Sequence, residues 1–293
     1  MLFILLVNLG CACDPPLYNY TKYNHSPIDK ASPLNYINYV KNRQETKCNL
    51  RDLPDKGIIL YYANTSELLN SIGIPPSEYE ACEIGTTAPS ELFIVKQKSG
   101  NAYVINRGLP GAGGVATQVA ELGALGVKYV IHIGTAGLLG SYLPNNSLIL
   151  SIGSYKDGAS YLMPVEDPTN KLAFPDLTLN KKIEEVFKQQ NITYEKAVGF
   201  TTPVIYYQPL ELIAALIIGK KPNHDPVARY IEMEEAPFFT AAKIAKVKAA
   251  SIVVGSDRTV ILNEKLTANF IPFKECEMKA LENIINVFDQ MRH

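Results

Sequence analysis

The stretch VATQVAELGALGVKYVIHIGTAG, residues 115–137, contains a complete helix-to-strand unit. Its first half repeats apolar residues at the spacing of one helix face, at Val115, Val119, Leu122 and Leu125. Gly126 follows, and glycine suits a helix end because it adopts a left-handed backbone without strain. Residues 128–133 are rich in β-branched side chains, which predicts a buried strand. A helix joined to a buried strand in this way predicts an α/β fold.

The same alternation continues on both sides of this unit. We expect further strands at residues 57–62, 92–97, 102–106, 147–152, 197–201 and 249–254. We expect further helices at residues 33–42, 179–190, 237–245 and 274–292. Strands that alternate with helices favour a largely parallel sheet, and no repeat or low-complexity linker divides the chain. The sequence therefore predicts one α/β domain over residues 56–293, preceded by an irregular extension at residues 14–55.

The N-terminus favours export. Residues 2–7 are apolar and lead into small residues, which is typical of a signal peptide at residues 1–13, and Leu9-Gly10-Cys11 is similar to a lipoprotein cleavage site. We expect a secreted or lipid-anchored protein; the alternative is a cytoplasmic protein with an apolar N-terminal strand. Export would allow a disulfide between Cys48 and Cys82, whereas a reducing compartment would leave buried thiols.

Composition excludes some classes of function. The chain has 293 residues, is 47% hydrophobic and carries a net charge of -1, without a basic stripe. We therefore expect no nucleic-acid partner. The five cysteines show no zinc-binding spacing, so no metal is expected either.

An unusual acidic triplet stands near the end of the chain, where residues 230–236 read YIEMEEA. Glu232, Met233 and Glu234 follow a short β-prone run, although acids are depleted in strands. Carboxylates accept hydrogen bonds from sugar hydroxyls, and a thioether packs on the apolar face of a sugar ring. The triplet therefore indicates a ribose site. The alternative is a solvated helix start, where the helix dipole favours acids.

Further polar or glycine-rich patches follow predicted strands, where open α/β sheets bind ligands. They lie at residues 108–114, 134–137, 157–161 and 255–258. Free glycine amides suit an anion, Thr135 adds a hydroxyl between glycines, and a carboxyl such as Asp257 suits a general acid. The alternatives are plain turns and, for Asp257, a helix cap or an ion pair with Arg258.

The order and spacing of these patches resemble the nucleoside phosphorylase superfamily, which contains purine and uridine phosphorylases and methylthioadenosine/S-adenosylhomocysteine nucleosidases. The resemblance covers residue 57 to the C-terminus. It rests on His132-Ile133-Gly134-Thr135-Ala136-Gly137, Lys156-Asp157-Gly158-Ala159-Ser160, Glu232-Met233-Glu234 and Ser256-Asp257. It implies a three-layer α/β/α domain with a central mixed, largely parallel sheet.

The resemblance also implies roles for single residues. Asp257 would protonate the purine at N7. Glu232 and Glu234 would hold the ribose hydroxyls, and Met233 would pack on the sugar. The base would lie against an aromatic ring, supplied by Tyr206 or Tyr207. Phosphate, or the water that replaces it, would bind at Gly134, Thr135 and His132.

Two departures from the family concern phosphate. His132 stands where the family has an arginine, and a neutral histidine lacks the permanent, fork-shaped charge of a guanidinium. The phosphate loop Gly-Asp-Pro-x-Arg is also absent, with Ser66 or Glu67 nearest to its arginine. The nucleosidases lack both arginines and activate water with a glutamate, a role that Glu67 would take. The uracil-binding Gln-x-Arg is missing as well, because Gln208 is followed by Pro209 and Leu210, so we expect a purine.

We therefore expect phosphorolysis of a purine nucleoside to free base and ribose 1-phosphate, with phosphate as cosubstrate and no other cofactor. One alternative is a nucleosidase that uses water. Another is an exported storage or binding protein without turnover, similar to the bark storage proteins of plants. Relatives form dimers or hexamers and complete a site with a neighbour's residue, so a homo-oligomer is expected, with His25 as one such donor.

Overall fold

The computed structural model describes residues 32–42, 50, 52–62, 64–84, 90–156, 160, 163, 170–208, 210–218, 227–263 and 265–291. The helices are α2 (Pro33–Asn42), α3 (Thr65–Ser71), the 3₁₀ turn η2 (Pro76–Glu78), α4 (Ala112–Ala124), α6 (Leu177–Gln189), α7 (Leu210–Ile218), α8 (Glu235–Ile244) and α9 (Lys274–Gln290). The strands are β1 (Lys56–Leu60), β2 (Tyr79–Ile84), β3 (Ser90–Lys96), β4 (Ala102–Arg107), β5 (Tyr129–Leu139), β6 (Leu148–Tyr155), β7 (Leu172–Ala173), β8 (Tyr194–Thr201), β9 (Ala228–Glu232), β10 (Lys248–Leu262) and β11 (Lys265–Phe270).

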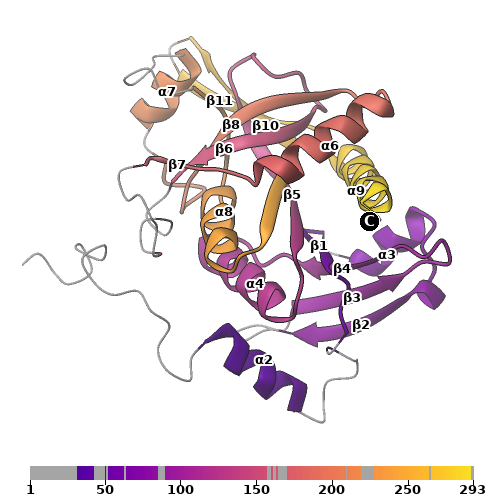
Figure 1. Ribbon diagram of the computed structural model, residues 1–293. Helices are drawn as coiled ribbons and strands as arrows, with labels where there is room; N and C mark the ends of the chain where they lie inside the picture. Colours follow the sequence, from indigo (N-terminus) through magenta and orange to yellow (C-terminus); the bar gives the residue numbers. More distant parts are fainter. Residues whose placement is uncertain are drawn as a thin grey trace, which may run out of the picture.

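All described strands belong to one mixed sheet, which partly closes on itself (Figure 1). Parallel pairs join β1 to β4 and β5, β5 to β10, and β8 to β6 and β9. Antiparallel pairs join β5 to β9 and β6 to β10. The strands β5, β10, β6, β8 and β9 therefore form a closed ring, and the remaining strands extend from it as an open sheet.

Helices cover both faces of this sheet. Apolar residues of α3, α6 and α9 share one hydrophobic core with β1, β5 and β10. Residues of α4 and α8 share a second core with the opposite face of β1, β3 and β4. Figure 1 shows α4 and α8 side by side, and the two helices are in contact. The predicted three-layer α/β/α architecture with a mixed, largely parallel sheet is confirmed.

Two strands are longer than the sequence predicts. We expected strands at 128–133 and 249–254, each followed by a glycine-rich or polar patch. The predicted strand ends were too early, because β5 continues to Leu139 and β10 to Leu262. The two strands pair along this whole length, and a bulge between Gly255 and Asp257 absorbs the irregular stretch. The predicted patches at 134–137 and 255–258 thus lie within strands.

The predictions for the N-terminus fall largely outside the described residues. The expected helix at 33–42 is confirmed as α2. Cys82 is disulfide-bonded and Cys276 is free, but Cys48, the predicted partner of Cys82, is not among the described residues. In the described part of the chain, no helix has the length and hydrophobicity to cross a membrane.

Candidate active site

Three strands bring the predicted residues of the site to one place. Gly137 of β5 pairs with Ile231 of β9 on one side and with Asp257 of β10 on the other. A Cβ at Gly137 would lie 2.9 Å from Oδ2 of Asp257 and 3.2 Å from Cγ2 of Ile231. The Asp257 carboxyl therefore lies directly over Gly137, and the absence of a side chain there makes room for it. One residue beyond Ile231, the acidic triplet begins.

The carboxyl of Asp257 remains available to a ligand at this site. Ser256 Oγ donates a hydrogen bond to Asp257 Oδ1 at 3.0 Å. The guanidinium of Arg258 turns away and donates to the carbonyl oxygens of Gly140 and Leu143 and to Asn145 Oδ1. The alternative of a turn aspartate paired with Arg258 is therefore not the arrangement in the structure.

Glu232 is occupied by hydrogen bonds within the protein. Its side chain is 4% exposed. Oε1 accepts from the hydroxyls of Ser154 and Thr201, and Oε2 accepts from the backbone N–H groups of Glu234 at 2.5 Å and Glu235 at 2.6 Å. Four donors fill the lone-pair positions of a carboxylate. In the structure Glu232 thus acts as a cap, which satisfies free amides at the start of α8. The ribose role expected for Glu232 stays a prediction.

Glu234 joins two of the predicted patches. The backbone N–H of Gly111, which precedes α4, donates to Glu234 Oε1 at 2.6 Å, and Met233 N–H lies 3.3 Å from Oε2. Burial, and then the negative charge of Glu232, raise the pKa of Glu234 to about 7. Glu234 and Met233 are both half-buried, so they remain accessible to a sugar at the end of β9.

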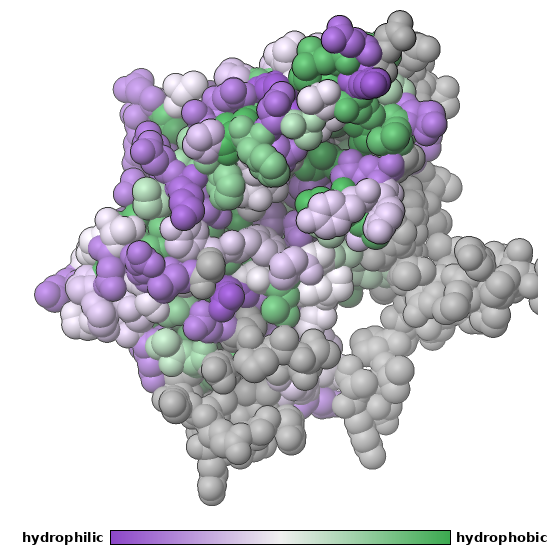
Figure 2. Space-filling model, turned by 180° about the vertical axis from the view of Figure 1, so that it is seen from behind, coloured by the Kyte–Doolittle hydropathy of each residue, from purple (hydrophilic) through white to green (hydrophobic). Residues whose placement is uncertain are grey.

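The two tyrosines expected against the base lie on the surface of the chain. Tyr206 and Tyr207 are 88% and 84% exposed, on the segment between β8 and α7. This segment and α7 form an apolar surface, and Figure 2 shows hydrophobic side chains gathered in the region of α7, at the top right. The role of these two rings stays a prediction.

His132 is a buried, uncharged side chain. It is 1% exposed, and its Nδ1 lies 2.8 Å from Ser251 Oγ. The imidazole packs against the rings of Tyr61 and Phe238, with ring centres 5.3 and 5.5 Å away. Burial lowers the pKa of His132 to about 3, so the ring is neutral at physiological pH. An arginine's position is thus filled by an aromatic cluster without charge.

The predicted phosphate segment is divided between the two faces of β5. The ring of His132 lies over Gly134, where a Cβ would be 2.8 Å from Cε1 of the ring. Side chains alternate between the faces of a strand, so residues 132 and 134 face one side and residues 135 and 137 the other. Thr135, which is half-buried, therefore shares a face with the carboxyl of Asp257, whereas His132 does not.

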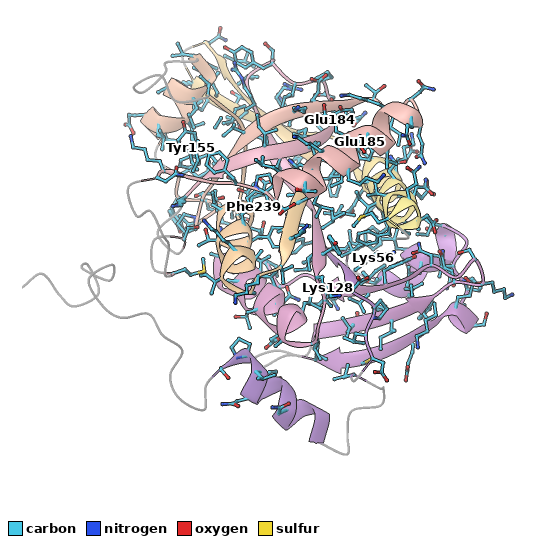
Figure 3. All side chains as sticks on the ribbon, viewed as in Figure 1. Lys56, Lys128, Tyr155, Glu184, Glu185 and Phe239 are labelled. Atoms are coloured by element: carbon cyan, nitrogen blue, oxygen red, sulfur yellow. The ribbon has the colours of Figure 1, made fainter. Side chains whose placement is uncertain are left out.

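The described arginines are engaged elsewhere. Arg107 forms an ion pair with Glu91 at 3.5 Å, and the guanidinium of Arg229 stacks 3.6 Å above the ring of Tyr142. Figure 3 shows Lys56 and Lys128 at the amino ends of β1 and β5, which is the opposite end of these strands from the site. Within the described part of the chain, no cation is recorded in contact with Thr135 or His132.

Two residues that sequence analysis left without a role lie beside the site. Tyr61 follows β1, where the family's phosphate loop would begin, and its ring fills the space over Gly108, at 2.5 Å from a hypothetical Cβ. Glu235 is completely buried next to Glu234. The signal that could have revealed Glu235 was a third acid at a buried strand end.

Glu67 has a structural role instead of the expected one. It lies exposed in the first turn of α3, where its backbone N–H donates to Asn64 Oδ1 and its carboxyl accepts from Asn64 Nδ2 at 3.1 Å. This reciprocal pair caps α3. The water-activating role considered for Glu67 therefore has no support from its position.

The predicted patch at 157–161 falls mostly outside the described residues. Asp157 and Gly158 fall outside the described residues, and Ser160 is buried. A cavity of about 820 Å³ opens beside α8, and its lining of described residues includes Phe174, Phe239 and Thr240. It also includes Lys156 of the family motif, but none of the residues to which the sequence gave a role. The described residues also contain no group of three acids, histidines or cysteines arranged to hold a metal ion.

Comparisons with known proteins agree with this architecture. The family model described as the phosphorylase superfamily matches residues 66–291. A uridine phosphorylase from Vibrio fischeri is 17% identical, with a TM-score of 0.62, and the match covers 83% of this chain and 95% of that one. A purine nucleoside phosphorylase from Toxoplasma gondii is 15% identical, with a TM-score of 0.64 and coverage of 85% and 99%. An AMP nucleosidase from Bacteroides thetaiotaomicron is 15% identical, with a TM-score of 0.63 and coverage of 89% and 98%.

Proposed function

Because the chain belongs to the phosphorylase superfamily, whose members act on nucleosides, we propose that it cleaves the N-glycosidic bond of a purine nucleoside. The observation that carries the proposal is the position of Asp257 over Gly137, two strands from the start of the Met233–Glu234 segment. An acid for the base and a carboxylate for the sugar thus lie at one end of three neighbouring strands. A purine fits because a carboxyl can protonate its N7. A uracil fits less well, because Gln208 is not followed by the arginine of the uracil-binding Gln-x-Arg motif.

The roles within the site follow from hydrogen bonding. Glu234 accepts from a ribose hydroxyl, and its negative charge stabilises the positive charge that develops on the sugar as the bond breaks. Met233 packs on the sugar ring. Asp257 donates a proton to the leaving purine, which takes the electron pair of the broken bond. General acid catalysis of this kind contributes roughly 10²–10⁴-fold to the rate.

For the nucleophile, the geometry of His132 favours water. A phosphate dianion needs positive charge or several free donors, but His132 is neutral, bonded to Ser251 and on the other face of β5 from Thr135. The amide of Gly111 at the start of α4, which would suit an anion, already donates to the Glu234 carboxyl. Water that adds to the sugar releases one proton, which replaces the proton given up by Asp257. The net reaction is nucleoside plus water to free base and ribose.

Phosphorolysis, our first expectation from the sequence, is the second candidate. The hydroxyl of Thr135 supports it, since Thr135 shares a face with the site. Base release from inosine, adenosine and methylthioadenosine, measured with and without phosphate, separates the candidates. Base release at the same rate with and without phosphate supports hydrolysis, and base release that requires phosphate supports phosphorolysis. Saturable binding without release would overturn both and favour a storage or binding protein.

Export and self-association are further proposals for this chain. The disulfide at Cys82 supports export, because such bonds persist mainly in oxidising compartments. Mass spectrometry of the native N-terminus tests it, since an intact Met1 would contradict cleavage. The homo-oligomer implied by family resemblance is tested by analytical ultracentrifugation of the purified protein.

A further inference from the structure

Glu235 is a buried acid to which the proposed reaction gives no role. It is 0% exposed and belongs to the first turn of α8. Its carboxyl reaches into the closed ring of strands, where Tyr230 OH and Ser151 Oγ lie 2.7 and 3.0 Å from Oε2. A Cβ at Gly199 would lie 2.8 Å from Oε2, so the strand opposite is shaped to admit this carboxyl.

The neighbouring acid Glu232 is better suited to carry a negative charge. Two of its four partners are the backbone N–H groups of Glu234 and Glu235, and a backbone N–H can only donate. A third partner, the Thr201 hydroxyl, accepts from the backbone N–H of Ala236 and donates to Glu232. Of the two buried acids, Glu232 therefore holds the charge.

The partners of Glu235 are of a different kind. Ser151 and Tyr230 bond its Oε2 through hydroxyl groups, which accept hydrogen bonds as readily as they donate them. A proton on the other oxygen, Oε1, leaves both of these bonds in place. Oε1 has no hydrogen-bond partner among the described residues and is free to carry that proton.

The charges around Glu235 also favour its protonated form. Burial, and then the negative charge of Glu232, raise the pKa of Glu235 well above its ordinary value. Tyr230 of β9 is neutral because burial raises its pKa, and His132 of β5 is neutral because burial lowers its own. No described cation offsets a negative charge at this position. Two carboxyls so close in a buried site do not both ionise.

We propose that Glu235 is a positioning residue that holds the single proton shared by the buried carboxyls of Glu232 and Glu235. In this form it leaves Glu232 ionised as the cap of α8 and anchors the first turn of the helix to the ring of strands. Glu234 lies between Glu232 and Glu235 in the sequence, so its backbone is held by the same contacts. The role of Glu234 in binding ribose rests on the proposed function, whereas the protonation of Glu235 does not.

Nuclear magnetic resonance of the full protein tests the proposal directly. With carboxyl-labelled glutamate at about pH 9, above the pKa of about 7 that burial gives Glu234 and Glu277, we expect a protonated glutamate signal. This signal should disappear in Glu235→Gln and remain in Glu277→Gln, which alters a buried glutamate of α9. A carboxylate signal for Glu235 at this pH would overturn the proposal.

Kinetics provide a second test. Glu235→Gln imitates the neutral carboxyl and should leave kcat and KM within about twofold of wild type, whereas Glu235→Met should raise KM about tenfold by loosening Glu234. A Gln variant as impaired as the Met variant would contradict the proposal. If the Met variant does not fold, the Gln variant and the carboxyl spectrum still decide. Absence of turnover in the wild type would contradict the proposed function but would not affect the spectroscopic test.

Discussion

At the residue scale, Asp257 and Glu232 differ in what their oxygens already bind. Ser256 occupies one oxygen of Asp257, and the other lies over Gly137 at the edge of the site. Glu232 receives four hydrogen bonds from the protein itself. Removing the charge of Asp257 should therefore affect chemistry, and removing that of Glu232 should affect stability.

Asp257→Asn should lower the rate of purine release roughly 10²–10⁴-fold, because the amide cannot donate the proton that the leaving base requires. The amide oxygen can still accept from Ser256, so the thermal midpoint should stay near that of wild type. Base release and thermal unfolding are the two measurements. Glu67→Gln, which alters an exposed cap of α3, is the control and should keep full activity. Unchanged release by Asp257→Asn would remove Asp257 from the mechanism.

Substitutions of the two glutamates of the triplet should affect different properties, stability for Glu232 and substrate binding for Glu234. Glu232→Gln should lower the free energy of unfolding by about 1–3 kcal/mol, because its amide group presents a donor to buried donors. Glu234→Gln should chiefly raise KM, because it weakens a half-buried ligand of the sugar. Urea unfolding and KM for inosine separate the two outcomes. A larger loss of stability in Glu234→Gln than in Glu232→Gln would contradict the assignment.

At the scale of elements, the long pairing of β5 with β10 builds the site. It carries both strands past the point where their sequences become irregular, and it places Gly137 beside Asp257. The ring that these strands close is tightly filled. Gly199 of β8 faces the ring of Tyr230 at 2.6 Å and the carboxyl of Glu235 at 2.8 Å, measured from a hypothetical Cβ.

Gly199→Ala should destabilise the protein by about 1–3 kcal/mol, because a methyl group has no room beside two buried side chains. Gly113→Ala is the matched control, since nothing lies within 4 Å of its hypothetical Cβ in the first turn of α4. Alanine is the better helix former, so this control should stabilise by up to roughly 1 kcal/mol. Urea midpoints measure both, and equal shifts would contradict the packing argument.

At the scale of the whole molecule, two separate cores hold the helices on the sheet. The helix α9 closes the core that it shares with α3 and α6, and it carries the buried acid Glu277. Burial raises the pKa of Glu277 to about 7. A buried carboxyl of this kind links the stability of the fold to pH.

The sign of the effect follows from the raised pKa. Glu277 contributes its full stability below the ordinary pKa of about 4.5, and this contribution is lost as the pH rises through about 7. Glu277→Gln does not titrate, so relative to wild type it should gain roughly 1–3 kcal/mol between those limits. Free energies of unfolding across this range measure the gain. Glu282→Gln, on the exposed side of α9, is the control, and a gain of equal size there would contradict the prediction.

The sequence by itself determined the succession of elements and the family motifs. Helices such as α4 and α9 were predictable because apolar periodicity and end signals are local properties of the chain. The edge strands β2 and β11 were not, because β2 contains acids and β11 is polar and exposed, and only pairing with a neighbour makes them strands. Asp257 and the acidic triplet were recognisable from residue type and order alone.

Only the tertiary structure decided what each of these residues is free to do. Glu232 is a cap because Ser154 and Thr201, from strands distant in sequence, meet its carboxyl. His132 is neutral because burial and Ser251 enclose it, and Asp257 is available because Arg258 binds another loop. The physical reason is common to all three cases. The charge and hydrogen bonding of a side chain depend on the groups that surround it, and chain folding brings those groups together from far apart in the sequence.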